Sequence, residues 1–224
     1  MGLIDKKRLV CSVTANCLIF ILVVFAFVLM MQRAGSTALT ARGLSSLKYF
    51  TTLSNIFAAL VSVVYTVFLI FALKGRREGV PHALFILKLM STAAVGVTFL
   101  VVIVFLGPLF GFASMYRGSN LWYHLIVPLI CILDFAFIER IDKVSFRETL
   151  FCMVPVFIYG MGYLINILVN GVGEWPNRND FYGFVLWGLP VGIAIFAGIM
   201  LIGWLWGIAL RAGNLAGRKK GDMI

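Results

Sequence analysis

Long apolar runs separated by short charged segments dominate this chain. A hydrocarbon core about 30 Å thick takes about 20 helical residues to cross. Six runs approach or exceed that length: residues 9–31, 48–73, 83–107, 121–138, 148–170 and 181–210. Because the linkers between them are short, consecutive helices should be antiparallel neighbours. The pattern predicts an all-α membrane protein, a bundle of six transmembrane helices forming a single domain over residues 1–224.

Composition supports this fold class and narrows the choice of partners. The hydrophobic content is 62%, well above that of soluble domains. The net charge is +10 at pH 7, but the charges lie between the apolar runs and form no basic stripe, which argues against nucleic-acid binding. Thirteen Lys and Arg residues flank one side of the predicted spans and five flank the other. Both termini are therefore expected to be cytoplasmic, following the positive-inside rule.

Four polar residues lie close together near the start of the predicted second span. It opens with K-Y-F-T-T-L-S-N, which places Thr51, Thr52, Ser54 and Asn55 among apolar neighbours. Inside a bilayer each of these groups needs a hydrogen-bond partner. Thr51, Ser54 and Asn55 have the spacing i, i+3, i+4, so a helix gathers them on one face. We expect His124 of the fourth span to meet this face.

Helical rise places the candidate groups at one depth. If the second and fourth spans both run inward from the outer surface, Thr51 lies ~4.5 Å and His124 ~6 Å below the starts of their helices. The fifth span runs the other way and brings Tyr163, Asn166 and Asn170 to the same level. Polar residues from these spans are therefore expected to converge in the outer leaflet.

This arrangement has a catalytic and a structural interpretation. Thr51 and His124 fit the roles of nucleophile and general base, because an imidazole can remove the proton that makes a hydroxyl a poor nucleophile. Ser54 and Asn55 could orient the nucleophile or donate to an oxyanion, and Tyr163 and Asn166 could line a head-group pocket. Alternatively, the hydroxyls bond back to a carbonyl or cap the helix. Small polar groups also pack membrane helices together, and a histidine near the interface can simply be hydrated.

A second polar pair is expected near the inner surface. Lys88 lies six residues into the third predicted span, and Asp134 lies about four residues from the inner end of the fourth. Their matching depths predict a structural ion pair, with snorkelling of Lys88 to the interface as the alternative. No metal site or cofactor is predicted. The four cysteines lack ligand spacing, and His82 and His124 fall on opposite sides of the membrane.

The segment K-Y-F-T in the second span, with His124 and Pro128 in the fourth, resembles the androgen-induced and androgen-dependent TFPI-regulating protein family and its bacterial relatives. The resemblance covers the six-span layout, and its specific part is these two short segments. It implies an intramembrane threonine hydrolase of fatty acid esters of hydroxy fatty acids. It also implies Thr51 as nucleophile and His124 as base, and the bacterial inner (plasma) membrane as location. A second threonine, Thr52, leaves the nucleophile ambiguous, and H-L-I-V-P is one residue shorter than the animal pattern.

The resulting hypothesis is a lipid-ester hydrolase that takes its substrate from the outer leaflet, with membrane lipids as its partners. The alternative is a transporter or lipid-binding protein that uses the same polar pocket without breaking a bond. Transporters tend to carry charged residues at mid-membrane, whereas here the charges inside the spans lie towards the inner end. A structural membrane subunit is a third interpretation.

Overall fold

The computed structural model describes residues 3–32, 43–76, 79–174 and 178–216, and within them it contains helices but no strand. Six helical segments in this part of the chain are long and apolar enough to cross a membrane. They are Lys6–Gln32, Phe50–Leu73, His82–Phe110, Ser119–Ile138, Arg147–Asn170 and Leu189–Ala216. The all-α, six-helix membrane fold predicted from the sequence is confirmed.

Several of these segments are built from more than one helical element. α1 (Leu3–Gln32), α2 (Phe50–Leu73) and α9 (Leu189–Ala216) are single α-helices. The third span joins α3 (His82–Val101), a π-helical turn η2 (Val102–Leu106) and α4 (Gly107–Phe110). The fourth joins α6 (Ser119–Leu121), the π-turn η3 (Trp122–Ile126), α7 (Val127–Leu133) and the π-turn η4 (Asp134–Ile138). The 3₁₀ helix η5 (Arg147–Met153) leads into α8 (Val154–Asn170), and two short helices, η1 (Gly43–Lys48) and α5 (Phe112–Met115), lie between spans.

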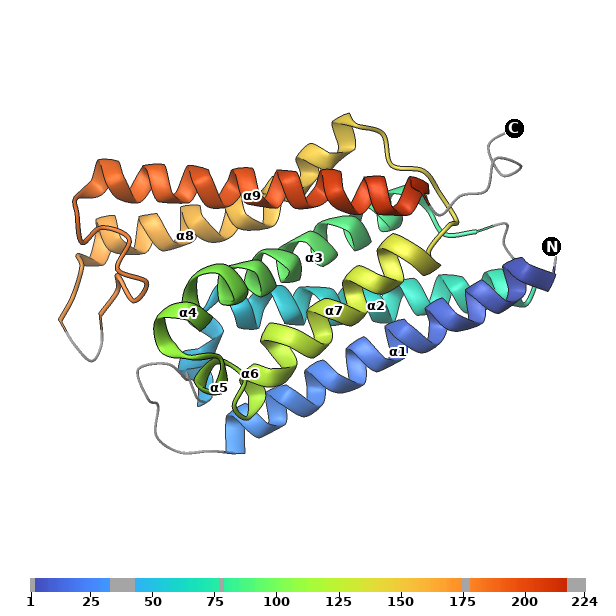
Figure 1. Ribbon diagram of the computed structural model, residues 1–224, viewed down its shortest axis with the longest axis horizontal. Helices are drawn as coiled ribbons and strands as arrows, with labels where there is room; N and C mark the ends of the chain where they lie inside the picture. Colours follow the sequence, from blue (N-terminus) through green and yellow to red (C-terminus); the bar gives the residue numbers. More distant parts are fainter. Residues whose placement is uncertain (1–2, 33–42, 77–78, 175–177, 217–224) are drawn as a thin grey trace.

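The helices form an elongated bundle in which α3 and α7 lie between α1 and α2 on one side and α8 and α9 on the other (Figure 1). α1 begins and α9 ends at the same end of the bundle (Figure 1). The basic residues Lys74 and Arg140 follow spans that end there, and Arg211 lies in the last turns of α9 at the same end. We refer to this as the inner end, following the charge rule. Some residues used in that count lie outside the described residues: Arg33, Arg42, Arg77, Arg218, Lys219 and Lys220.

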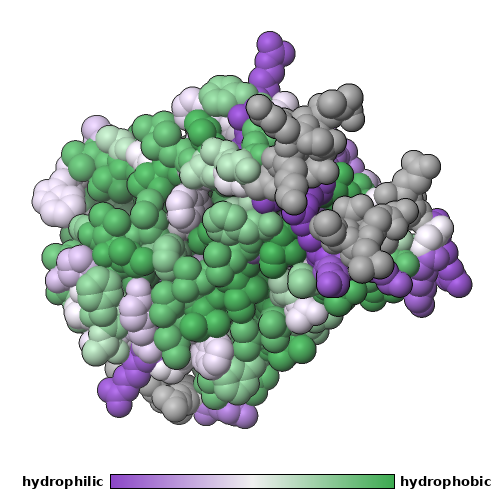
Figure 2. Space-filling view, turned by 45° about the vertical axis from the view of Figure 1, so that its right-hand side comes forward, coloured by the Kyte–Doolittle hydropathy of each residue, from purple (hydrophilic) through white to green (hydrophobic). Residues whose placement is uncertain are grey.

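The core is apolar, and so is most of the outer surface. Tyr65, Leu69 and Phe85 centre one buried cluster, and Ile19 and Val127 belong to another. Large apolar side chains also cover the outside of the bundle, as the broad hydrophobic face in Figure 2 shows. A surface of this kind is stable when it faces hydrocarbon rather than water.

The π-turn around His124 has a local cause in the sequence. Pro128 has no amide hydrogen, so it cannot donate to the carbonyl four residues earlier, which belongs to His124. The N–H of Val127 instead reaches back to Trp122, five residues away, and closes the wider turn η3. His124 therefore lies in a widened turn, a feature often found at functional sites.

Several predicted span boundaries differ from those of the structure, most of all in the sixth span. The second span begins at Phe50 rather than at residue 48, because Gly43–Lys48 forms a separate 3₁₀ helix. The sixth begins at Leu189 rather than at residue 181 and ends at Ala216 rather than at residue 210. Gly183 and Gly188 adopt φ values of 71° and 93°, which favour turns. The apolar character of residues 181–188 thus comes from a folded segment that packs on α8, not from a membrane helix.

Candidate functional site

The first turn of α2 lies against the π-turn that carries His124. One amide spans the two helices: Asn55 Nδ2 donates to the Thr51 carbonyl at 2.8 Å and to the Tyr123 carbonyl at 3.2 Å. Tyr123 immediately precedes His124 in the chain. The turn that carries the Thr51 hydroxyl and the turn that carries the imidazole are therefore neighbours, in keeping with the equal depths expected from the sequence. Within the described residues, no hydrogen bond joins the two side chains directly.

The tautomer of His124 follows from the one hydrogen bond that its ring makes within the described residues. His124 is 7% exposed, and its Nδ1 lies 3.0 Å from the backbone carbonyl of Met115, in the short helix α5. A carbonyl only accepts, so Nδ1 carries a hydrogen, and in the neutral ring Nε2 then keeps its lone pair. The imidazole is thus oriented by a backbone carbonyl and presents a basic nitrogen, as a general base requires.

The other polar residues of this turn are tied into the helix packing. The Ser54 hydroxyl donates to the Thr51 carbonyl at 3.1 Å and lies 3.4 Å from the Thr98 hydroxyl of α3, so it links helices. Thr52 is buried at 3% exposure, while Thr51 is only partly buried. Because both N–H groups of Asn55 are bound to carbonyls, Asn55 has none left for an oxyanion, contrary to that expectation.

Tyr163 and Asn166 bind the segment that connects α8 to α9 at the outer end of the bundle. They were expected to line a pocket near His124. The Tyr163 hydroxyl donates to Asp180 Oδ1 at 2.5 Å, and Asn166 Nδ2 donates to Asn179 Oδ1 at 3.4 Å. Asp180 is 1% exposed and also accepts the backbone N–H groups of residues 184 and 185. These bonds fold the segment between α8 and α9 back onto α8.

The residues that bring α8 to the start of α2 were not predicted from the sequence. The Tyr159 hydroxyl donates to the Lys48 carbonyl at 2.7 Å, and the Tyr182 hydroxyl accepts the N–H of Phe50 at 2.9 Å. An aromatic collar surrounds these bonds; its members are Tyr49, Tyr159, Tyr163, Phe181, Tyr182 and Phe184. Partial burial in the collar raises the pKa of the Tyr49 phenol. The i, i+4 spacing of Tyr159 and Tyr163 was a signal for one aromatic face of α8.

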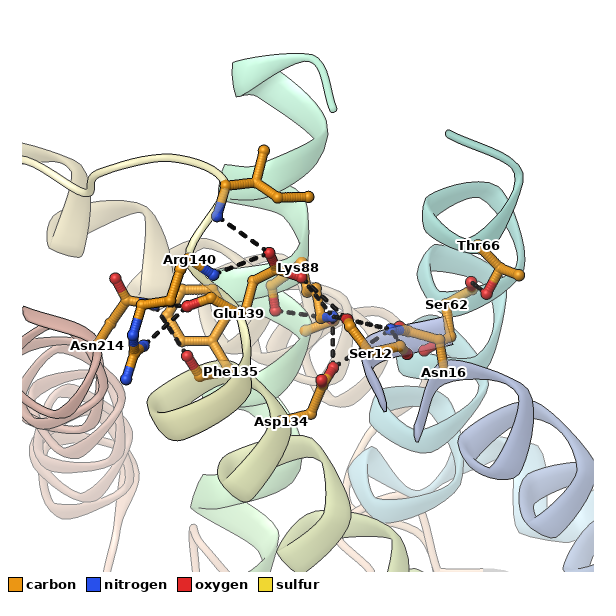
Figure 3. Close-up of polar contacts among 12 residues, drawn as sticks. Ser12, Asn16, Ser62, Thr66, Lys88, Asp134, Phe135, Glu139, Arg140 and Asn214 are labelled. Carbon is orange, nitrogen blue, oxygen red and sulfur yellow. Dashed lines mark hydrogen bonds and ion pairs between the residues drawn. The ribbon is translucent and has the colours of Figure 1, made fainter. Parts of the chain in front are cut away.

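A second polar cluster lies near the inner end (Figure 3). The sequence predicted an ion pair between Lys88 and Asp134, and the Lys88 ammonium lies 2.5 Å from Asp134 Oδ2. The ammonium also lies 3.4 Å from Glu139 Oε2, 3.5 Å from the Ser12 hydroxyl and 4.1 Å from the centre of the Tyr65 ring. Lys88 is 3% exposed, so it does not snorkel. Glu139 and the α1 residues were not anticipated from the sequence.

The fold and its apolar surface define the chain as a multi-pass integral membrane protein with an all-α bundle. No family model, curated protein or solved structure matches it. Its candidate chemistry lies in two polar sites, the Thr51–His124 region near the outer end and the Lys88 cluster near the inner end.

Proposed function

We propose that this chain is an intramembrane lipid-ester hydrolase with Thr51 as nucleophile and His124 as general base. The substrates would be fatty acid esters of hydroxy fatty acids or similar lipids, entering from the outer leaflet of a bacterial plasma membrane. The substrate class and the location rest on the resemblance of the K-Y-F-T and His124–Pro128 segments to a family of membrane threonine hydrolases. The chemistry rests on the geometry of this chain.

The observation that carries the proposal is the orientation of the imidazole. The Met115 carbonyl holds the hydrogen of His124 on Nδ1, which leaves Nε2 as a base in a widened turn next to the turn of Thr51. This arrangement supplies two of the three parts of an activated hydroxyl, the base and the group that orients it. The hydrogen bond between Thr51 and His124 would form when substrate excludes water, since catalytic hydrogen bonds often tighten only in the complex.

The start of α2 supplies a candidate oxyanion donor. Thr51 is the second residue of α2, and within the described chain its backbone N–H has no acceptor. Unpaired N–H groups in the first turn of a helix carry a partial positive charge and bind anions. The Thr51 amide would thus donate to the oxyanion formed by attack of its own hydroxyl.

The reaction follows in two halves. His124 Nε2 removes the Thr51 hydroxyl proton while Thr51 Oγ1 bonds to the ester carbonyl carbon. The carbon–oxygen bond to the leaving alcohol then breaks, and the alkoxide takes the proton from the imidazolium. Water attacks the acyl-enzyme with His124 again as base, and collapse returns the proton to Thr51 and releases the acid. Atoms and charges balance without a cofactor.

Ester hydrolysis by the purified protein in lipid nanodiscs tests the proposal. Thr51→Ala and His124→Ala should each lower kcat/KM by at least ~100-fold, the effect typical of losing a general base or its nucleophile. Thr52→Ala is the matched control, because Thr52 is the adjacent buried hydroxyl. A hydroxyl-directed fluorophosphonate should label the wild type and Thr52→Ala but not Thr51→Ala. Hydrolysis that survives both the Thr51 and the His124 substitution would refute the mechanism.

A further inference from the structure

The inner cluster contains a buried carboxyl with one oxygen unbound. Asp134 is 0% exposed. Its Oδ2 accepts Lys88 at 2.5 Å and the Asn16 amide at 3.3 Å. Its Oδ1 has no hydrogen-bond partner within the described residues. An anionic oxygen without a donor in a low-dielectric interior carries a large desolvation penalty.

Glu139 differs from Asp134 although both contact the same ammonium. Glu139 Oε1 accepts the backbone N–H groups of Arg140 and Ile141 at 3.1 and 3.2 Å, and Oε2 accepts Ser12 at 3.0 Å and Lys88 at 3.4 Å. Both of its oxygens are therefore served by donors, as an ionised carboxylate needs. Of the two carboxyls, Asp134 is therefore the one with an oxygen that no donor reaches.

Further atoms around the cluster lack partners. Asn16 and Tyr65 are both 0% exposed, and Asn16 Oδ1 and the Tyr65 hydroxyl have no hydrogen-bond partner in the described chain. The amide orientation of Asn16 is determined, because its Nδ2 faces three acceptors: the Ser12 carbonyl, the Ser12 hydroxyl and Asp134. Asn16 Oδ1 is thus a buried acceptor without a donor, whereas the Tyr65 hydroxyl carries a hydrogen of its own. The three hydrogens of the Lys88 ammonium are already directed to other groups.

We propose that the Lys88 cluster is a proton-binding site and that the proton resides on Asp134 Oδ1. A proton turns the unbound oxygen into a donor and neutralises the carboxyl, while Oδ2 still accepts from Lys88. A sodium ion fits less well, because it would lie next to the Lys88 ammonium with few free oxygens around it. The site is independent of the ester chemistry at Thr51.

The cluster extends from Asp134 through Lys88 to Glu139, towards the inner end of the span. Asp134 begins the π-turn η4, about four residues from the inner end of the span. Lys88 bridges Asp134 to Glu139, and Glu139 is bonded to the backbone of the connection that follows. The charged or titratable groups around Asp134 are Lys88 on α3, Glu139, Tyr65 on α2 and Cys131 on α7. Asn16 and Ser12 come from α1. Asn214 of α9 donates to the carbonyls of Phe135 and Glu139. Arg140 donates to the Ala136 and Glu139 carbonyls. Chains of this kind carry protons in membrane proteins.

Infrared spectroscopy of the protein in lipid nanodiscs at neutral pH tests the proposal. The wild type should show the carbonyl band of a protonated carboxylic acid, and labelling only the aspartate side-chain carboxyls with ¹³C should shift that band. The band should disappear in Asp134→Asn and persist in Glu139→Gln. Asp142→Asn, which alters a more exposed carboxyl at the same end, is the matched control and should also keep it.

The isotope result needs no substitution, so it stands even if a variant does not fold. The absence of a protonated carboxyl band in the wild type would overturn the proposal and leave water or a cation as the missing partner. A band that ignores the aspartate label, or that survives in folded Asp134→Asn, would overturn it as well.

Discussion

Replacing Lys88 with methionine is the most direct test of how the inner cluster stabilises the bundle. Methionine keeps an unbranched chain of similar length and removes the charge. The substitution takes away hydrogen bonds to Asp134 at 2.5 Å, Glu139 at 3.4 Å and Ser12 at 3.5 Å, and the contact with the Tyr65 ring at 4.1 Å. It leaves Glu139, which is 2% exposed, without its cation.

The expected loss follows from these contacts. Hydrogen bonds to a charged group are worth about 1.5–3 kcal/mol each, and a desolvated cation–π contact about 2 kcal/mol. Part of this is offset, because methionine does not need its ammonium taken out of water. Removing one partner of a buried pair costs about 3–5 kcal/mol in total. We expect that decrease in the free energy of unfolding of the Lys88→Met variant.

The assay is reversible unfolding in mixed detergent micelles followed by circular dichroism, with Lys74→Met as the control. Lys74 is an exposed lysine at the inner end of α2, so its loss should change stability by less than about 0.5 kcal/mol. Adding Glu139→Gln to Lys88→Met should recover part of the loss, because it removes the uncompensated charge. A Lys88→Met variant as stable as the control, or no recovery in the double variant, would refute this account of the cluster.

Two further predictions concern helix packing and the start of α2. A Cβ built on Gly96 would lie 1.2 Å from Trp206 Nε1 of α9, so Gly96→Ala should force the helices apart and lower unfolding free energy by about 1–3 kcal/mol. Gly162→Ala, with nothing within 4 Å of its Cβ, should be neutral or stabilising, and equal effects would contradict the packing argument. Tyr182→Phe removes the acceptor of the Phe50 N–H at 2.9 Å and should cost about 1 kcal/mol. It should also speed amide hydrogen exchange in the first turn of α2, and unchanged exchange there would count against that role.

Periodicity and composition were enough to predict the number of membrane helices and their approximate positions, because a bilayer leaves few ways to satisfy backbone hydrogen bonds. The depth of a residue along a helix follows from a fixed rise, which is why the sequence also placed Thr51 level with His124 and Lys88 level with Asp134. These are one-dimensional properties of the chain.

Hydrogen-bond partners were decided by the tertiary structure. Nothing in the sequence says that the Met115 carbonyl sets the tautomer of His124, that both hydrogens of the Asn55 amide are occupied, or that Tyr159 reaches the Lys48 carbonyl. Each depends on how helices rotate about their axes and on how the outer segment folds back. The fold of the apolar residues 181–188 was likewise not specified by the sequence, since hydropathy does not distinguish a membrane helix from a turn packed against aromatic rings. Rotation and packing depend on contacts between distant parts of the chain, so they emerge only when the whole bundle is assembled.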